Sequence, residues 1–250
     1  MNRQPYRTTT PSAYRVVIAG LRPIVAGLTR QVWSGGEHLP AEGGFIVAAN
    51  HVSEIDPFTL AHFLVDHGTP PAFLAKESLF RIPVVGPLLP RLGQVPVHRG
   101  TARATESLDA AGRAVTEGHC VVILPEGTLS RDPDLWPMRA RPGVGRLALQ
   151  TRAPVVPVAQ WGPQQLLAPY ARRPTGLFSR VPMHVRAGAP VPLDDLYDRT
   201  DEAAAAREAT DRVMRAITRL VADLRGEDPP AVPWDHRLGR RPVPGEEVAE

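Results

Sequence analysis

The sequence predicts an α/β fold, with a sheet covered by helices and preceded by an amphipathic N-terminal helical segment. Two observations support this class. Short apolar runs alternate with helical patterns through the middle of the chain, and an alanine- and arginine-rich helical pattern follows them. Such alternation is typical of helices that cover a sheet. With 250 residues, 43% of them hydrophobic and 22% charged, the chain has a globular composition and can bury a sizeable core.

The elements are expected in a regular order along the chain. Strands are predicted at 45–49, 72–75, 95–98, 120–124, 154–159 and near 184. Helices are predicted at 57–66, 101–117, 142–151 and 201–225, the last with a buried face of Val213, Met214, Ile217, Leu220, Val221 and Leu224. We therefore divide the chain into membrane-docking helices (1–40), an α/β domain (41–225) and a Pro-rich tail (226–250) that is disordered or draped over the surface.

The N-terminal stretch "SAYRVVIAGLRPIVAGLTRQVW" has an arginine stripe on one side and an apolar face on the other. The stripe contains Arg15, Arg22 and Arg30, and Pro23 is expected to break the stretch into two short helices. Such a segment either lies in a bilayer interface above anionic lipids or packs on its own domain with a solvated arginine face. No run reaches the ~18 apolar residues of a membrane span. We expect a peripheral protein on the cytoplasmic face of the cell membrane.

Composition and single residues exclude several classes. The net charge is +3, but Lys76 is the only lysine, and the lysine clusters and interleaved aromatics of nucleic-acid-binding surfaces are missing. Cys120, the one cysteine, excludes an internal disulfide and reads as a buried strand residue. No CxxC or HExxH pattern occurs, so we predict neither a metal site nor a bound cofactor.

The stretch "NHVSEIDPF", residues 50–58, places His51 and Asp56 five positions apart after an apolar strand. On a regular helix these side chains would point about 140° apart, so a contact needs a bend. Asp56 followed by Pro57 reads as a helix N-cap with proline in the first turn, which leaves His51 on the preceding loop. The carboxylate can then fold back, fix the imidazole tautomer and make His51 a general base. The alternative is a surface histidine beside an ordinary cap.

Two later stretches offer binding groups. "GQVPVHRGT" places Arg99 before a helix start, where a guanidinium and free backbone amides can bind a phosphate. "VVILPEGTLSRD" follows a strand with Glu126, Gly127 and Thr128 in a tight turn that can hold a substrate. Each stretch alone also has a purely structural explanation, so their order along the chain is the stronger signal.

That order, NHxxxxD, GxVPVxR, PEGT and then VVP, resembles the glycerolipid acyltransferase family, whose best-known members are 1-acylglycerol-3-phosphate acyltransferases. The resemblance implies transfer of an acyl group from acyl-CoA or acyl carrier protein to the hydroxyl of a lysophospholipid at a membrane. It implies that His51 is the base and Asp56 orients it. It also implies that Arg99 and the segment Glu126–Thr128 bind the acceptor. Backbone amides near the His51 loop are candidates to stabilise the developing oxyanion, but the sequence does not assign them.

The chain departs from the family pattern in two places. Leu129 stands where the family has an arginine, and Arg141 in "RPG" is a possible stand-in for a missing lysine. If the segment after Thr128 is extended, Arg131 shares a face with Leu129, so we predict that Arg131 contacts the acceptor phosphate. Lysophosphatidic acid is the favoured acceptor. Other lysolipids, glycerol 3-phosphate and lipid-linked acceptors stay open, as do a thioester or lysolipid hydrolase and a non-catalytic membrane-binding domain.

Overall fold

The computed structural model describes residues 12–83, 85–97, 104–175 and 179–243. Within these residues seven strands form one sheet in the order β1-β7-β6-β2-β5-β3-β4. Their bounds are Thr29–Ser34 (β1), Phe45–Ala49 (β2), Pro71–Lys76 (β3), Val95–Val97 (β4), Cys120–Ile123 (β5), Val155–Trp161 (β6) and Val181–Ala187 (β7). Strands β2 to β6 run parallel, β7 is antiparallel to β6, and β1 is parallel to β7.

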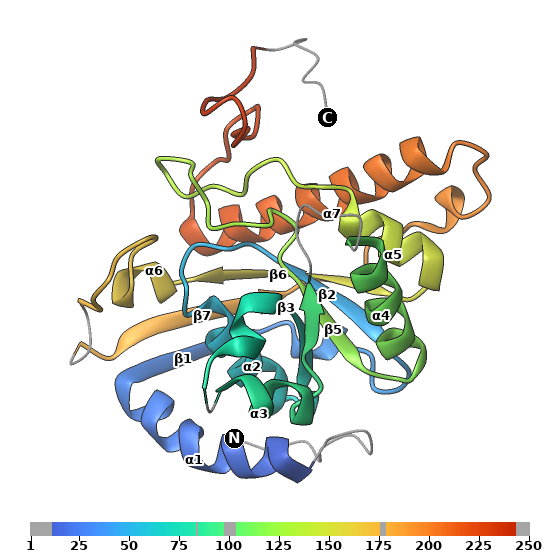
Figure 1. Ribbon diagram of the computed structural model, residues 1–250. Coiled ribbons are helices and arrows are strands. Elements are labelled where there is room, and N and C mark those ends of the chain that lie inside the picture. The colour runs from blue at the N-terminus through green and yellow to red at the C-terminus, as the bar shows by residue number, and fades with distance from the viewer. Residues whose placement is uncertain (1–11, 84, 98–103, 176–178, 244–250) are drawn as a thin grey trace.

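Helices cover both faces of this sheet (Figure 1). Their bounds are Ser12–Leu28 (α1), Asp56–Asp66 (α2), Val85–Arg91 (α3), Ala104–Thr116 (α4), Gly143–Thr151 (α5), Pro163–Leu166 (α6) and Glu202–Arg225 (α7). Short 3-10 turns lie at Gly36–His38, Glu77–Arg81 and Asp194–Leu196. Helices α4, α5 and α7 pack on one face and α2 on the other, which confirms the predicted α/β class.

The centre of the core is β2, whose five residues are all buried. Ile46 and Ala48 face the helices α4, α5 and α7, whereas Phe45, Val47 and Ala49 face α2. A strand buried on both faces reads as a continuous apolar run, which is why "FIVAA" shows no polar alternation.

The N-terminal prediction is wrong in two respects. Residues 29–34 form β1, which pairs with β7 from Thr29 to Ser34, so the sheet begins before the predicted boundary at residue 40. Helix α1 also continues through Pro23. A proline weakens a helix, but Val25 and Leu28 beyond it are half-buried against the domain, and this packing stabilises the last turns.

Most other elements lie within a few residues of their predicted bounds. Helix α7 buries Val213, Met214, Ile217 and Val221, and Leu220 and Leu224 pack beside them. The predicted start of the helix at 101 lies outside the described residues. Helices α3 and α6 were not predicted, because "VGPLLPR" and "PQQL" are short and proline-containing.

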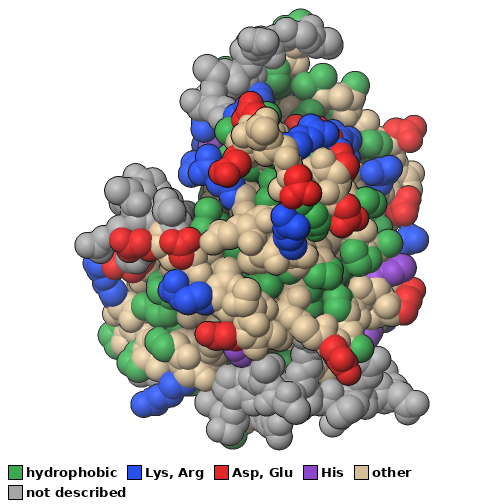
Figure 2. All heavy atoms as spheres, turned by 90° about the vertical axis from the view of Figure 1, so that its right-hand side faces the viewer, with side chains coloured by type: hydrophobic (Ala, Val, Ile, Leu, Met, Phe, Trp, Pro, Cys, Tyr) green, Lys and Arg blue, Asp and Glu red, His purple; other side chains and the backbone are tan. Residues whose placement is uncertain are grey.

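Figure 2 shows a face on which acidic and basic side chains are interspersed between hydrophobic ones. In the described part of this face, no large area of one charge stands out. Among the residues that the structure describes, no helix has both the length and the apolar content to cross a membrane.

Candidate active site

The candidate site lies where three neighbouring parallel strands end. The loops after β2, β5 and β6 begin at the same edge of the sheet, because the carboxyl ends of parallel strands meet there. Asn50 and Gln160, both fully buried, join the ends of β2 and β6. Asn50 Nδ2 donates to the Gln160 carbonyl at 3.0 Å, and Gln160 N donates to Asn50 Oδ1 at 2.9 Å. These bonds hold the start of the His51 loop in place.

The predicted contact between His51 and Asp56 is present. His51 Nδ1 lies 2.9 Å from Asp56 Oδ2, and the same oxygen accepts from Val52 N at 2.6 Å and Ser53 N at 2.8 Å. Asp56 is the first residue of α2, and Ile55 occupies the N-cap position, so the predicted N-cap role of Asp56 is wrong. Its carboxylate turns back to the loop because three donors converge on one oxygen there.

Burial and hydrogen bonding act in opposite directions on Asp56. Burial raises the pKa of Asp56, and the hydrogen bonds from His51, Ser53 and Val52 offset part of that rise. The His51 side chain keeps 16% of its surface exposed, whereas that of Asp56 is fully covered. With Nδ1 donating to Asp56, Nε2 is the ring nitrogen that can accept a proton from a substrate hydroxyl.

Glu126 holds the backbone of His51. Its side chain is fully buried, Oε1 accepts from His51 N at 3.0 Å, and Oε2 accepts from Met138 N at 3.0 Å. On the other side, Ser130 N donates to the His51 carbonyl at 2.7 Å. Residues of the loop after β5 therefore form hydrogen bonds with both the amide and the carbonyl of His51. The predicted contact of Glu126 with the acceptor stays a prediction, and the observed contacts are with the protein backbone.

These bonds correct the expectation for the oxyanion. The amides of His51, Val52 and Ser53 all donate to the buried carboxyl groups of Glu126 and Asp56. They are therefore not free to bind a developing negative charge, and the stabilising donors must come from elsewhere.

The turn at Gly127 brings Arg141 to the site. Gly127 has a φ of 71°, and a Cβ added there would lie 3.9 Å from Arg141 Cδ and Nε. Leu129 is buried whereas Arg131 is exposed, and the predicted contact of Arg131 with the acceptor phosphate stays a prediction. Ser130 N donates to the His51 carbonyl in this segment, and Leu129 and Ser130 are both buried.

Tyr170 is a site residue that the sequence did not indicate. Its hydroxyl donates to the Leu129 carbonyl at 3.1 Å and lies 3.5 Å from both Thr128 Oγ1 and Arg131 Nε. Its amide donates to Glu54 Oε1 at 3.1 Å, and its φ is 61°. Tyr170 thus joins the His51 loop to the turn at 126–128. No local pattern in "LLAPYARRP" marks this role.

Two further predictions concern what the site holds. Arg99 lies outside the described residues, so its position is not part of the site geometry. In the described ranges, no group of three or more His, Cys, Asp or Glu side chains is arranged to hold a metal ion.

A His–Asp pair at the carboxyl edge of a covered α/β sheet is suited to general-base catalysis. Comparison with known proteins gives the family. The family model "Acyltransferase" matches residues 31–161, more than half of the chain. The chain belongs to this acyltransferase family, which confirms the resemblance read from the motifs.

Individual relatives carry more specific names. A 1-acyl-sn-glycerol-3-phosphate acyltransferase of Limnanthes douglasii is 31% identical over 202 residues, which cover 79% of this chain and 68% of that protein. The enzyme of the same name from Borreliella burgdorferi is 31% identical over 142 residues, 56% of this chain and 52% of that protein, so the match spans about half of that relative.

A solved structure supports the fold. The crystal structure of the 1-acyl-sn-glycerophosphate (LPA) acyltransferase PlsC from Thermotoga maritima superposes with a TM-score of 0.65 at 24% identity, covering 87% of this chain and 81% of that one. At this identity the similarity establishes a shared fold.

Glu126 predicts a specific pH dependence of stability. Burial raises its pKa from 4.5 to about 8, so between these values the folded protein binds more protons than the unfolded chain. The contribution of this group to stability is therefore fully present below pH 4.5 and is lost as the pH rises toward 8. In urea unfolding across this range, wild type should lose up to ~1.4 kcal/mol per pH unit more than Glu126→Gln. Parallel pH curves for the two proteins would show that Glu126 does not titrate in this way.

Proposed function

We propose that the chain transfers an acyl group from acyl-CoA or acyl carrier protein to the hydroxyl of 1-acylglycerol 3-phosphate, forming phosphatidic acid. One observation carries this proposal. His51 Nδ1 is bound to the buried Asp56 carboxylate at 2.9 Å, which leaves Nε2 for an incoming hydroxyl. The names of the relatives support the choice of acceptor.

The arrangement supports a direct transfer. Nε2 of His51 takes the proton of the acceptor hydroxyl while its oxygen attacks the thioester carbonyl. The tetrahedral intermediate then expels the thiolate, which receives the proton from His51. Asp56 stabilises the imidazolium that forms in between, and no covalent enzyme intermediate is required. A positioned base of this kind contributes ~10²–10⁴-fold to the rate.

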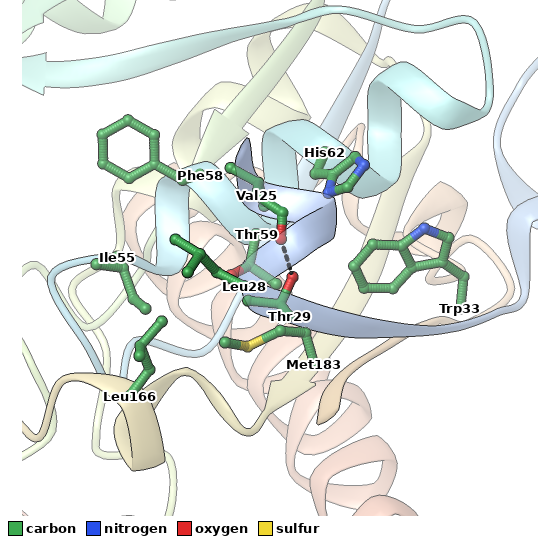
Figure 3. A pocket seen from close by; sticks show the side chains of 10 residues that line it. All are labelled: Val25, Leu28, Thr29, Trp33, Ile55, Phe58, Thr59, His62, Leu166 and Met183. Atoms are coloured by element: carbon green, nitrogen blue, oxygen red, sulfur yellow. Dashed lines mark hydrogen bonds between the residues drawn. The ribbon is translucent and has the colours of Figure 1, made fainter. Parts of the chain in front are cut away.

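A mostly apolar cavity beside the His51 loop suits an acyl chain (Figure 3). It has a volume of about 160 Å³ and is lined by Val25, Leu28, Thr29, Trp33, Ile55, Phe58, Thr59, His62, Leu166 and Met183. Ile55 in the cavity wall directly precedes Asp56, which is the hydrogen-bond partner of the candidate base His51. Apolar cavities of ~150 Å³ stay dry and accept hydrocarbon groups of benzene size, so this one can take a short part of an acyl chain.

The acceptor phosphate is proposed to bind at the turn of Gly127 and Thr128. Arg141 flanks Gly127, and Arg131 approaches Thr128 through the Tyr170 hydroxyl. Both arginines are exposed and can present a guanidinium to a phosphate. Arg99 is expected to join them.

Arginine substitutions test this acceptor site. Arg131→Ala and Arg141→Ala should each raise KM for lysophosphatidic acid, with kcat changed less, because a lost phosphate contact weakens binding of ground state and transition state alike. The double variant should be non-additive, since both side chains share one ligand. Steady-state assays with lysophosphatidic acid and with monoacylglycerol, which lacks the phosphate, measure both effects. If wild type prefers monoacylglycerol, the assignment of a phosphate-bearing acceptor is wrong.

The proposed cellular place is the cytoplasmic face of the membrane, reached through the first half of α1. Val16 is 73% exposed there. Arg22, by contrast, is not available to lipid, because its guanidinium pairs with the buried carboxylate of Asp66 at 2.5 Å. Trp33 Nε1 donates to the same carboxylate at 3.0 Å. The second half of α1 is therefore packed on its own domain, and only the first half is proposed to enter the interface.

Liposome co-sedimentation tests this docking. Replacing Arg15 by glutamine removes a positive charge worth ~1 kcal/mol near an anionic surface, and Val16→Asp removes an inserting side chain. Both variants should bind anionic vesicles less than wild type, with the charge effect weaker at high salt. Arg146→Gln, an exposed position on α5 over the other face of the sheet, is the control. Unchanged vesicle binding in both test variants would place the contact elsewhere.

A further inference from the structure

The segment after α7 lies across the loop that grips His51. Residues 226–243 are described, and the red part of the chain rises from the end of α7 past the loop after β5 (Figure 1). Residues 234–241, which we call the clasp, touch the loop at both of their ends.

The first end of the clasp holds Arg139. The amide of Arg139 donates to the Trp234 carbonyl at 2.9 Å, and its guanidinium lies 3.8 Å from Asp235 Oδ2. The second end holds Asp132. Arg241 pairs with Asp132 Oδ2 at 2.6 Å, and the Asp132 side chain is fully covered. The pair is therefore shielded from solvent on the acidic side, where an ion pair is worth more than at the surface.

The clasp keeps its own shape. Asp235 is buried, its amide donates to the Arg240 carbonyl at 3.0 Å, and its carbonyl accepts from Gly239 N at 3.0 Å. Its Oδ1 accepts from Arg237 N at 2.8 Å. These bonds close residues 235–240 on themselves, so the two ends of the clasp are held at a set spacing.

Both contacts are connected to His51 through a short series of hydrogen bonds. From Asp132, the amide donates to Ser130 Oγ at 3.3 Å, and Ser130 N donates to the His51 carbonyl at 2.7 Å. From Arg139, the neighbouring Met138 N donates to Glu126, whose other oxygen accepts from His51 N. Each end of the clasp therefore stabilises one of the two groups that fix the backbone of His51.

We propose that the clasp is a positioning element for His51, with Arg241 and Asp132 as its principal residues. This inference rests on the proposed function, because the position of His51 matters through its role as the base. Neither residue contacts the substrate in this account. They act by keeping Nε2 where the acceptor hydroxyl arrives, and a misplacement of about 1 Å can cost ~10²-fold in rate.

The test compares Arg241→Gln, Arg241→Lys and the control Arg219→Gln, an exposed position on α7. With acyl-CoA and lysophosphatidic acid, Arg241→Gln should lower kcat per folded enzyme by ~10–100-fold with little change in KM, because positioning affects the chemical step. Arg241→Lys keeps the charge and should recover much of kcat. Arg219→Gln should match wild type. A role in fold stability alone would leave kcat per folded enzyme unchanged, and a phosphate contact by Arg241 would raise KM, so either result overturns the proposal.

A second readout does not need activity. Amide hydrogen exchange at Ser130 should be faster in Arg241→Gln, while the amides of β2 keep their wild-type rates, because only the loop is loosened. If Arg241→Gln does not fold, the double variant Asp132→Asn/Arg241→Gln, which removes both charges of the ion pair, is used for the same exchange measurement. Unchanged exchange at Ser130 in a folded variant overturns the clasp. A wild type that does not acylate lysophosphatidic acid refutes the proposed function, and the exchange result then decides on the clasp by itself.

Discussion

Replacing His51 with alanine lowers kcat for acyl transfer by ~10²–10⁴-fold, the usual contribution of a positioned base. The fold should survive, because the side chain is partly exposed and Asp56 keeps two of its three donors, the amides of Val52 and Ser53. Steady-state turnover with labelled acyl-CoA measures the loss, and circular dichroism checks the fold.

A matched control makes this result specific. His119 is a partly exposed histidine at the start of β5, so His119→Ala removes an imidazole away from the site. It should retain wild-type turnover. Near-normal kcat in folded His51→Ala protein would remove His51 as the base.

Two substitutions of Asp56 should differ strongly from each other. In Asp56→Asn the carbonyl oxygen can take the place of Oδ2 and still accept from His51 and from two amides, so the tautomer of the ring is kept. What is lost is the negative charge that stabilises the imidazolium. We expect kcat to fall by ~10²-fold or more, since a charge-assisted hydrogen bond becomes a neutral one in a buried setting.

Asp56→Ala leaves three donors without an acceptor. Each unsatisfied buried group costs ~1–3 kcal/mol, so this variant should lose several kcal/mol of unfolding free energy in addition to its activity. Urea unfolding and turnover, measured on both variants, separate the two effects. Equal stability of the alanine and asparagine variants would contradict the role of Asp56 as an organiser of the loop.

The parts of the site that could be predicted are local in sequence. His51 and Asp56 are five residues apart, and the start of a helix at Pro57 indicates the bend that lets them meet, although Glu126 and Ser130 also hold the backbone of His51. The strands of the core were predicted for the same reason, since an apolar run such as Phe45–Ala49 has one environment that suits it.

The parts that could not be predicted depend on distant partners. Glu126 reads as a substrate group in a tight turn, but its oxygens are occupied by amides 75 and 12 positions away. Tyr170 forms hydrogen bonds with Leu129 and Glu54 only because three loops pack together. The bond from Ser130 N to the His51 carbonyl joins residues 79 positions apart, so the burial of Leu129 and Ser130 beside an exposed Arg131 also depends on a distant partner.

The products formed from one labelled acyl donor show whether the chain transfers the acyl group to lysophosphatidic acid. Purified protein is incubated with labelled acyl-CoA, with and without lysophosphatidic acid, and the products are identified by mass spectrometry, with His51→Ala protein in parallel. We expect labelled phosphatidic acid as the main product, formed only when the acceptor is present and nearly absent with His51→Ala. Free fatty acid as the main product, at the same rate with and without acceptor, would contradict acyl transfer and identify a hydrolase.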